Sequence, residues 1–251
     1  MKRKFYILAA AAGLLVICGC SKPVTPVPVL LDQAAVKAGE GDWTGADQLA
    51  KQVLEQDKDN ADALMLRALA RYTLDSQNEA VEYAIHAARV RSDSFAAHYI
   101  QGMLLSKSGK SDLALRALKE ARRLRPGDTN TLILLAENAI ALRRFQEAAG
   151  YFKLLASDKK YLKTPYLWNG LGICLLSNPN QALKFFRMAE RFGPNDPVTA
   201  LNLAVLHDAH LKQQTAALSG YERFLQLTSG QAEYDLLRSK VSLRLESLRG
   251  R

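Results

Sequence analysis

The sequence is poor in residues that could form covalent cross-links. Its 251 residues include three cysteines, Cys18, Cys20 and Cys174. The first two fall in a targeting segment described below, so Cys174 has no intramolecular partner and no disulfide is expected. Cys174 lies beside Leu175 in an apolar stretch, where a free cysteine behaves as a small buried hydrophobic residue.

Motifs of catalysis are missing as well. There is no Gly-rich phosphate loop, no Gly-x-Ser-x-Gly and no Cys–His pair with nucleophile character. His207 and His210 are three residues apart, a spacing that can share a metal ion, but no further Cys/His cluster or Glu-x-x-His motif accompanies them. We therefore expect no enzyme activity, metal or cofactor. A metal hydrolase that uses these two histidines is the competing hypothesis.

Acidic residues are outnumbered, because 34 basic and 25 acidic residues give a net charge of +9 at pH 7. Lys2, Arg3 and Lys4 supply part of this excess. Several of the other basic residues share one predicted helix: Arg116, Lys119, Arg122, Arg123 and Arg125. A solvated face is the simplest interpretation, and contact with anionic lipid headgroups or acidic glycan is the alternative. Aromatic and basic residues are not interleaved in a motif, so a nucleic-acid partner is not expected.

The N-terminus has the pattern of a targeting segment. After a basic start, residues 5–18 form an uncharged apolar run, which is shorter than the roughly 20 residues of a membrane-spanning helix. The run ends in Ile17-Cys18-Gly19-Cys20, which resembles a bacterial lipobox. The resemblance implies that residues 1–19 are a lipoprotein signal peptide and that Cys20 carries acyl chains such as palmitate. An ordinary secretory signal with an incidental cysteine is the alternative.

The residues that follow Cys20 refine this expectation. An Asp directly after the lipidated cysteine would resemble an inner-membrane retention signal, but this position is Ser21. The outer membrane, with the protein facing the periplasm, is therefore the expected location. Three prolines, Pro23, Pro26 and Pro28, fall within six residues and favour an extended polyproline conformation. Residues 20–29 are therefore expected to be a lipidated cysteine followed by a spacer.

A fixed period runs through the rest of the chain. Residues 95–128 predict two helices joined by Ser108-Gly109-Lys110 and stopped at Pro126. Equal steps from Ala114 reach further alanines, and a last step, longer by one, reaches Ala217; the set is Ala46, Ala80, Ala114, Ala148, Ala182 and Ala217. A period of about 34 residues indicates a solenoid of stacked units.

The period and residue types resemble the tetratricopeptide repeat. Trp168-x-x-Leu171-Gly172-x-x-Leu175 is similar to the W-x-x-L-G-x-x-Y signature, and the third repeat matches it at Gly102, Gly109, Ala114, Ala121 and Pro126. The resemblance implies an all-α solenoid, a right-handed superhelix of about six helical hairpins over residues 30–229. In the fifth repeat, residues 159–163 are expected to add two residues, and the turn near Pro179 to lose two.

A terminal segment, residues 230–251, follows the repeats. Its apolar residues recur at helical spacing: Tyr234, Leu237, Val241, Leu245 and Leu248. We expect a helix that caps the exposed end of the array. Leu236 and Leu243 interrupt its polar side, so a helix that binds a partner or a membrane surface is the alternative.

The first helix of each such repeat lines a concave groove at its second, fifth, ninth and twelfth positions. The resemblance therefore implies a binding surface made of Met65, Leu69, Tyr72, Tyr99, Met103, Asn130, Ile133, Glu137, Asn169 and Ile173, with Leu201, Val205 and Asp208 beyond them. Its first half is apolar and contains methionine, which favours a peptide or helix held by apolar anchors. Burial of these side chains in the solenoid, or under the terminal helix, is the alternative.

These observations predict a membrane-anchored scaffold or adaptor that binds another envelope protein. Its size, repeat number and lengthened fourth-to-fifth linker are similar to those of pilotin-like lipoproteins of type IV pilus biogenesis, which implies a role in assembling a pilus or secretion complex. An adaptor for cell-wall hydrolases or outer-membrane assembly is one alternative. A protein that binds anionic glycan or a lipid surface is another. No small-molecule substrate is expected.

Overall fold

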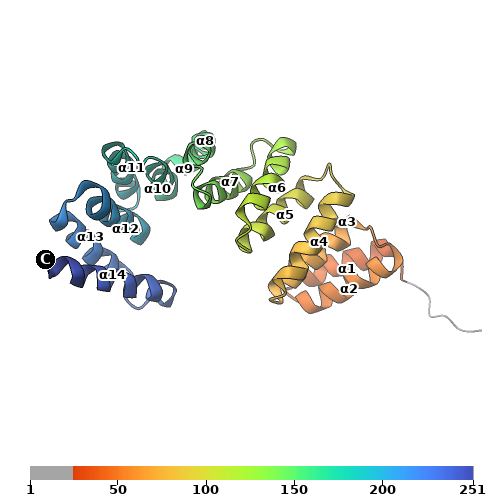
Figure 1. The fold of residues 1–251 in the computed structure, drawn as a ribbon. Coiled ribbons are helices and arrows are strands. Elements are labelled where there is room, and N and C mark those ends of the chain that lie inside the picture. The colour runs from red at the N-terminus through yellow and green to blue at the C-terminus, as the bar shows by residue number, and fades with distance from the viewer. Residues whose placement is uncertain (1–24, 251) are drawn as a thin grey trace, which may run out of the picture.

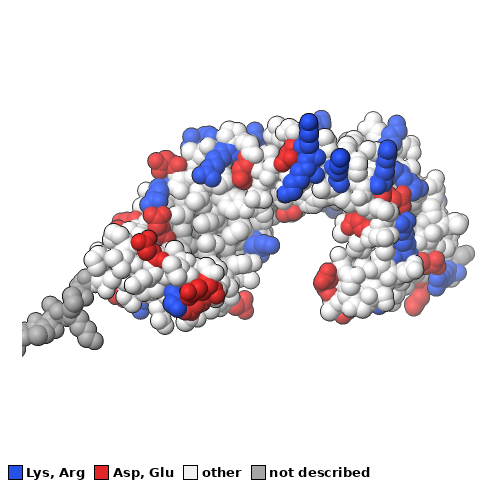
Figure 2. All heavy atoms as spheres, turned by 180° about the vertical axis from the view of Figure 1, so that it is seen from behind, with Lys and Arg blue, Asp and Glu red and all other residues white. Residues whose placement is uncertain are grey.

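The computed structural model describes residues 25–250, which form helices and no strand (Figure 1). The helices follow one another along an arch, with the N-terminal hairpins in one limb and the C-terminal helices in the other. Seen from behind, the arch is hollow underneath, and Lys and Arg side chains gather along its outer edge (Figure 2). The predicted signal peptide, the lipidation at Cys20 and the start of the predicted spacer lie outside the described residues.

Residues 25–250 contain six helical hairpins and a terminal helix. The hairpins are α1 (Val27–Gly39) with α2 (Trp43–Gln56), α3 (Ala61–Thr73) with α4 (Gln77–Val90), α5 (Phe95–Lys107) with α6 (Ser111–Leu124), α7 (Thr129–Ala141) with α8 (Phe145–Leu155), α10 (Pro165–Cys174) with α11 (Pro179–Phe192), and α12 (Pro197–Val205) with α13 (Gln214–Leu227). The short α9 (Lys159–Leu162) precedes α10, the π-helix η1 (Leu206–Leu211) continues α12, and the 3₁₀ turn η2 (Ala232–Tyr234) precedes α14 (Asp235–Arg249). The predicted all-α solenoid is confirmed.

The predicted period sets where the second helix of each hairpin begins. These helices start at Trp43, Gln77, Ser111, Phe145, Pro179 and Gln214, so the steps between them are equal except the last, which is longer by one. The six alanines in phase with this period are all 0% exposed: Ala46, Ala80, Ala114, Ala148, Ala182 and Ala217. Only a methyl group fits at this point, because the two helices of a hairpin and the next hairpin all meet there.

On the first helices, glycine allows the same close approach between helices. A Cβ atom at Gly102 would lie 2.5 Å from Cγ of Leu118, and one at Gly172 would lie 2.4 Å from the ring of Phe186. Both pairs occupy equivalent places, in the third and fifth hairpins. Gly102 and Gly172, which both match signature positions of the repeat, are therefore required for the same reason, the close approach of the second helix.

Two departures from the period are absorbed locally. The two extra residues expected before the fifth hairpin lie at α9, and α10 is three residues shorter than α7 at 10 residues, so α11 returns to the expected start at Pro179. The extra residue of the sixth hairpin lies between the starts of α12 and α13, where the chain winds into the π-helix η1. A π-turn contains one residue more than an α-helical turn, so η1 takes up the added residue before α13 begins.

The first helix begins earlier than predicted. We expected residues 20–29 to be extended, but α1 starts at Val27. Pro28 is compatible with this start because the first-turn N–H groups of a helix have no intrahelical partner. Leu30 and Ala34 are buried, and their contacts with α2 and α3 stabilise α1.

An ion-pair cluster joins the first two hairpins. Asp47 of α2 accepts from Nε of Arg67 at 2.9 Å and from Nη2 of Arg71 at 2.7 Å, both in α3. Asp47 and Arg67 are 7% and 8% exposed, and the Arg67 guanidinium lies 4.4 Å from the ring centroid of Tyr83. Since a buried charge is costly unless it is paired, this cluster fixes how the first hairpin sits on the second.

Asp47→Ala is expected to lower the free energy of unfolding by about 3–5 kcal/mol, because it leaves the buried Arg67 without its carboxylate. Urea denaturation followed by circular dichroism measures this change. Asp112→Ala is the control: Asp112 pairs with Arg116 and Arg144 at the surface, and its loss should cost less than about 1 kcal/mol. Similar losses for the two variants would contradict a structural role for the buried cluster.

The turns inside the hairpins make a second prediction. Gly41, Asp75, Gly109 and Arg143 occupy the same place in four successive repeats, and all have φ between 56° and 82°. A residue with a Cβ atom is strained in this region. Gly109→Ala should therefore lower the free energy of unfolding by about 1 kcal/mol, and Arg143→Gly should raise it by up to about 1 kcal/mol. Gly127→Ala, at an open position without positive φ, should have little effect in the same melting experiment; the reverse signs at Gly109 and Arg143 would refute the strain argument.

Candidate partner-binding groove

The first helices line the inner side of the arch. Neighbouring first helices contact one another, α1 with α3, α3 with α5, and α5 with α7, and pack more closely than neighbouring second helices. Because the inner side of a curved array has the shorter path, the helices that approach each other must lie there. The side chains that these helices turn away from their own hairpins therefore face the hollow of the arch.

A groove of about 460 Å³ crosses α1, α3 and α5 on this side. Its lining is mostly apolar, with two carboxylates: Leu31, Asp32, Ala35, Asp62, Met65, Leu66, Leu69, Ala96 and Ile100. Several of these residues are one repeat apart, so that Leu31 is equivalent to Met65, and Ala35 to Leu69. Ala35 and Ala96 are small and exposed, so they leave space between the larger side chains of the lining.

The two carboxylates of the groove differ in their environment. Asp62 accepts two hydrogen bonds from the guanidinium of Arg91, at 2.8 and 2.9 Å. Asp32 is exposed on α1 and also borders a second hollow on the other side of that helix. The groove therefore has an apolar floor, with Asp62 paired to Arg91 and Asp32 exposed to solvent at its edge.

Two of the predicted groove residues, Met65 and Leu69, line this hollow. Four others are only partly exposed and pack against the main core: Tyr72, Tyr99, Met103 and Ile133. Burial, with Asp128 nearby, raises the pKa of Tyr99 above its ordinary value. Asn130 and Glu137 are exposed on α7, and Glu137 accepts a hydrogen bond from the Tyr166 hydroxyl at 3.1 Å. The apolar half of the predicted surface thus divides between the groove and the core beside it.

Asn169 does not present its side chain to the groove, and its prediction is corrected. It is 5% exposed, and it donates to Oγ1 of Thr199 at 2.8 Å and accepts from Nδ2 of Asn202 at 3.1 Å. Both partners belong to α12, so the amide joins two first helices instead of facing solvent. Ile173 is likewise partly buried, against the cluster around Phe186.

Several groove residues were missing from the prediction. Leu31, Asp32 and Ala35 belong to the first hairpin, whose sequence matches the repeat poorly. Leu31 and Ala35 stand one repeat before Met65 and Leu69, so the period contains a signal for this part of the groove. Ala96 is the second residue of α5, in the same place as Asn130 of α7, so the pattern also contains a signal for it. Ile100 lies one residue after the fifth position, and only packing shows that it faces the hollow.

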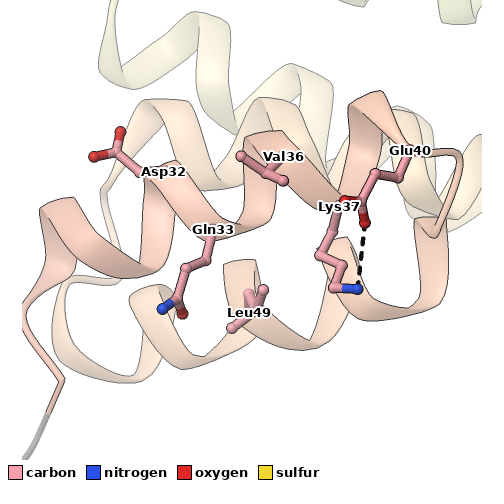
Figure 3. A pocket seen from close by; sticks show the side chains of 6 residues that line it. All are labelled: Asp32, Gln33, Val36, Lys37, Glu40 and Leu49. Carbon is pink, nitrogen blue, oxygen red and sulfur yellow. Dashed lines mark hydrogen bonds and ion pairs between the residues drawn. The ribbon is translucent and has the colours of Figure 1, made fainter.

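The exposed end of α1 and α2 has a hollow of its own, of about 480 Å³ (Figure 3). Gln33 and Val36 of α1 and Leu49 of α2 line it, and Lys37 pairs with Glu40 at 3.4 Å. Val36 is 59% exposed, because no earlier hairpin among the described residues covers this face.

The terminal helix covers the other end of the array. Val241, Leu245 and Leu248 of α14 are buried against α13, as predicted. Leu237 is 40% exposed, so its predicted place on the buried face is wrong; η2 and Tyr234 cover part of α13 instead, with the Tyr234 ring against Phe224. Leu236 and Leu243 are the most exposed large hydrophobic residues of the described chain, at 70% and 67%.

Asp208, a predicted position of the concave surface, is bound by this helix. Its carboxylate accepts two hydrogen bonds from Arg244 of α14, both at 2.7 Å, and one from the Tyr221 hydroxyl at 3.0 Å. The bonds from Arg244 hold the pKa of Asp208 below its usual range. Asp208 is therefore covered by the chain itself, in agreement with one of the alternatives drawn from the sequence, whereas Val205 beside it is 39% exposed.

The two histidines considered as metal ligands lie in η1. His207 is 7% exposed, and its Nδ1 lies 2.7 Å from Oε1 of Gln213, whereas His210 is exposed. No group of three His, Cys, Asp or Glu residues within residues 25–250 is arranged to hold a metal ion. Cys174 is buried, and burial raises the pKa of its thiol to about 11.

Asp208→Asn is expected to loosen α14, because the amide cannot accept both guanidinium hydrogen bonds. Backbone amides of α14 should exchange faster with solvent, while those of α3 and α5 keep their rates. The folded-state pKa of Asp208 is depressed, so its stabilisation is present at neutral pH and is lost as pH falls below about 4; the difference between wild type and variant should shrink there. Asp235→Asn, in an exposed pair with Arg238, should leave exchange unchanged. Equal rates in all three proteins would contradict this account.

Comparison with known proteins agrees with the architecture. Residues 99–161 and 133–197 match the sequence model of the tetratricopeptide repeat. No curated protein matches the chain in sequence. None of the described helices combines the length and apolar character that a membrane crossing needs.

Solved structures share the fold at low sequence identity. A tetratricopeptide repeat protein from Parabacteroides merdae aligns with a TM-score of 0.73 and 16% identity over 87% of this chain and 86% of its own. Pseudomonas aeruginosa PilF aligns with a TM-score of 0.60 and 18% identity over 85% and 97%. YrrB, described as a TPR protein with an unusual peptide-binding site, gives 0.57 and 16% over 76% and 97%. With its six hairpins in phase and these matches, the chain is a tetratricopeptide-repeat protein, and its described residues form an α-solenoid.

Proposed function

We propose that this protein is a membrane-anchored scaffold that holds a segment of another envelope protein in the groove across α1, α3 and α5. The observation that supports this proposal most is the groove itself, an apolar hollow on the inner side of the array with Met65 and Leu69 in its floor. Exposed apolar surface of this kind marks sites of protein interaction. Tetratricopeptide repeats generally act as scaffolds, and no catalytic role is proposed.

The lining of the groove favours an extended peptide or one face of an amphipathic helix. Leucine, isoleucine and methionine side chains accept apolar anchors, and a thioether adapts to anchors of different shape. Small residues, Ala35 and Ala96, leave room for a side chain of the partner between the larger groups. The carboxylate of Asp32 at the edge is free to pair with a basic residue beside the anchors.

The anchor predicted at Cys20 lies at the same end of the array. The first described residue, Thr25, accepts a hydrogen bond at its carbonyl oxygen from Gln56 at the end of α2, and α1 begins two residues later. A lipid at Cys20 would therefore hold the groove, rather than the C-terminal hairpins, near the membrane surface. We propose the outer membrane, with the solenoid in the periplasm.

Among envelope processes, assembly of a pilus or secretion complex is the leading candidate. The resemblance to pilotin-like lipoproteins rests on the predicted anchor, the number of repeats and the lengthened fourth-to-fifth linker. The alignment with PilF shows a shared fold and nothing about a partner. An adaptor for cell-wall hydrolases or for outer-membrane assembly uses the same surface and is the alternative.

Binding of acidic glycan along the whole outer face has less support. Many basic residues of the second helices are already paired: Arg116 with Asp112, Lys119 with Glu147, Arg123 with Glu120, Arg187 and Arg223 with Glu190. Paired charges attract a polyanion weakly because their fields cancel at short range. The groove is therefore the better candidate for the main binding surface.

Filling the groove tests the proposal without disturbing the core. Ala35→Arg combined with Ala96→Arg places two long side chains in the hollow at exposed helical positions, so helicity and melting should stay nearly unchanged. In crosslinked co-purification of the full-length protein from its own membranes, the variant should recover at least about tenfold less of the main protein partner than the wild type does. The reason is that the partner's apolar anchors no longer fit.

A matched variant controls for added charge. Gln48→Arg combined with Gln52→Arg places two arginines at exposed positions of α2, outside the groove, and should capture the partner as well as the wild type. Equal capture by the groove variant would show that the partner binds elsewhere. Loss of capture by both variants would point to charge and not to the groove.

A further inference from the structure

The segment inserted between the fourth and fifth hairpins differs in chemistry from the rest of the array. Residues 153–163 comprise the last turn of α8, a short connection and α9. They contain four exposed lysines, Lys153, Lys159, Lys160 and Lys163. Asp158 is the one acidic residue in this range, and its Oδ1 accepts from the backbone N–H of Lys160 at 2.9 Å, as the cap of α9.

These lysines have no ion-pair partner among the described residues. Within residues 25–250, none of the four pairs with a carboxylate, whereas Lys119 and Arg123 of α6 both do. An unpaired lysine keeps its full charge available to an external anion. The segment is therefore a local cluster of unpaired positive charge with four lysines in eleven residues.

Apolar side chains lie among the lysines. Leu154 is 45% exposed and Leu162 is 36% exposed. Tyr161 is partly exposed, and the Lys160 ammonium lies 5.6 Å from its ring centroid. Lysine next to leucine and tyrosine is the composition of protein surfaces that rest in the headgroup region of a bilayer, where the stems of lysine lie along the apolar layer and the ammonium groups reach the phosphates.

The fold holds this segment in place. The indole N–H of Trp168 in α10 donates to the carbonyl oxygen of Leu162 at 2.9 Å. The Trp168 ring stacks on Phe185 and Phe192 of α11, with centroids 6.0 and 6.2 Å apart. The insertion is thus presented by the body of the fifth hairpin, and little conformational freedom remains to be lost on binding.

Its position in the arch gives it access to a broad surface. α9 lies near the crest of the arch, between α8 and α10 and away from the opening (Figure 1). Lys and Arg side chains line the outer edge there (Figure 2). The four lysines are exposed, so a surface that approaches this part of the arch can contact them.

We propose that residues 153–163 dock the solenoid onto an anionic phospholipid surface. The four basic residues are all lysines, which act as mobile point charges and suit a field of headgroups; recognition of fixed carboxylates on an acidic protein more often uses the planar fork of arginine. The lysines attract the headgroup phosphates, and Leu162 and Leu154 enter the layer between them. This docking is independent of whether the groove binds a protein.

Vesicle co-sedimentation of the full chain tests the proposal. Cys20→Ser is included in every protein, because it removes the predicted acylation site. Vesicles of phosphatidylglycerol and phosphatidylethanolamine should bind the protein more tightly than phosphatidylcholine vesicles, and added salt should weaken binding. Lys159→Gln, Lys160→Gln and Lys163→Gln together should reduce affinity for the anionic vesicles by more than about tenfold, since each lysine near the surface contributes about a fivefold effect.

A second triple variant has the same net charge. Lys51→Gln, Lys110→Gln and Lys240→Gln remove three exposed lysines far from the insertion and should change affinity less than about twofold. Leu154→Ser combined with Leu162→Ser should lower the vesicle affinity that remains at high salt, because this part of the binding comes from apolar side chains. Equal loss in the two lysine triples would overturn the proposal, because net charge alone would explain it. Unchanged vesicle binding of the first triple variant would also overturn the proposal and would favour an acidic protein as the partner of these lysines.

Discussion

The structure depends on one packing constraint, the close approach of helices at a methyl group or a hydrogen atom, which recurs once in every repeat. The six alanines at the start of the second helices are fully buried, and Gly102 and Gly172 face Leu118 and Phe186 with no room for a Cβ atom. Each hairpin has a seam that only its neighbours can cover, so the array exists as a stack or not at all. Position in the stack then decides which side chains face the inner side, the outer side or the ends.

Deviations from the period show how strictly this constraint acts. Two extra residues before α10 are followed by a shorter first helix, and α11 starts where the period requires. One extra residue in the sixth hairpin is absorbed by the π-helix η1, so Ala217 still reaches its buried place. The added residues lie at α9 and η1, where they leave the packing of the second helices in place. Insertions of this kind are free to acquire new chemistry, since they do not serve the core.

The sequence was sufficient for the architecture because the constraint is written in residue types. Alanine, glycine and proline at fixed spacing identified the hairpins and the irregular fifth repeat. It was less informative for the site. Asn169 has the position of a groove residue, but its hydrogen bonds to Thr199 and Asn202 bury it, and such partners cannot be read from a pattern in one helix. Ala35 and Ala96 contribute to the groove by being small, and a pattern that looks for large apolar residues passes over them.

The ends of the array also explain where a partner can bind. At the C-terminal end, Arg244 occupies the carboxylate of Asp208 and α14 buries its apolar face on α13, so this end of the array is capped and Asp208 is not available to a partner. At the N-terminal end, nothing in residues 25–250 plays this role for α1, and the apolar hollow across α1, α3 and α5 stays open. The Asp47–Arg67 cluster fixes α2 on α3 beside it, so the open hollow has a rigid frame. An array closed at one end and open and rigid at the other presents its binding surface asymmetrically, and the predicted anchor attaches at the open end. A partner held there would lie close to the predicted lipid anchor, while α14 lies at the far end of the arch.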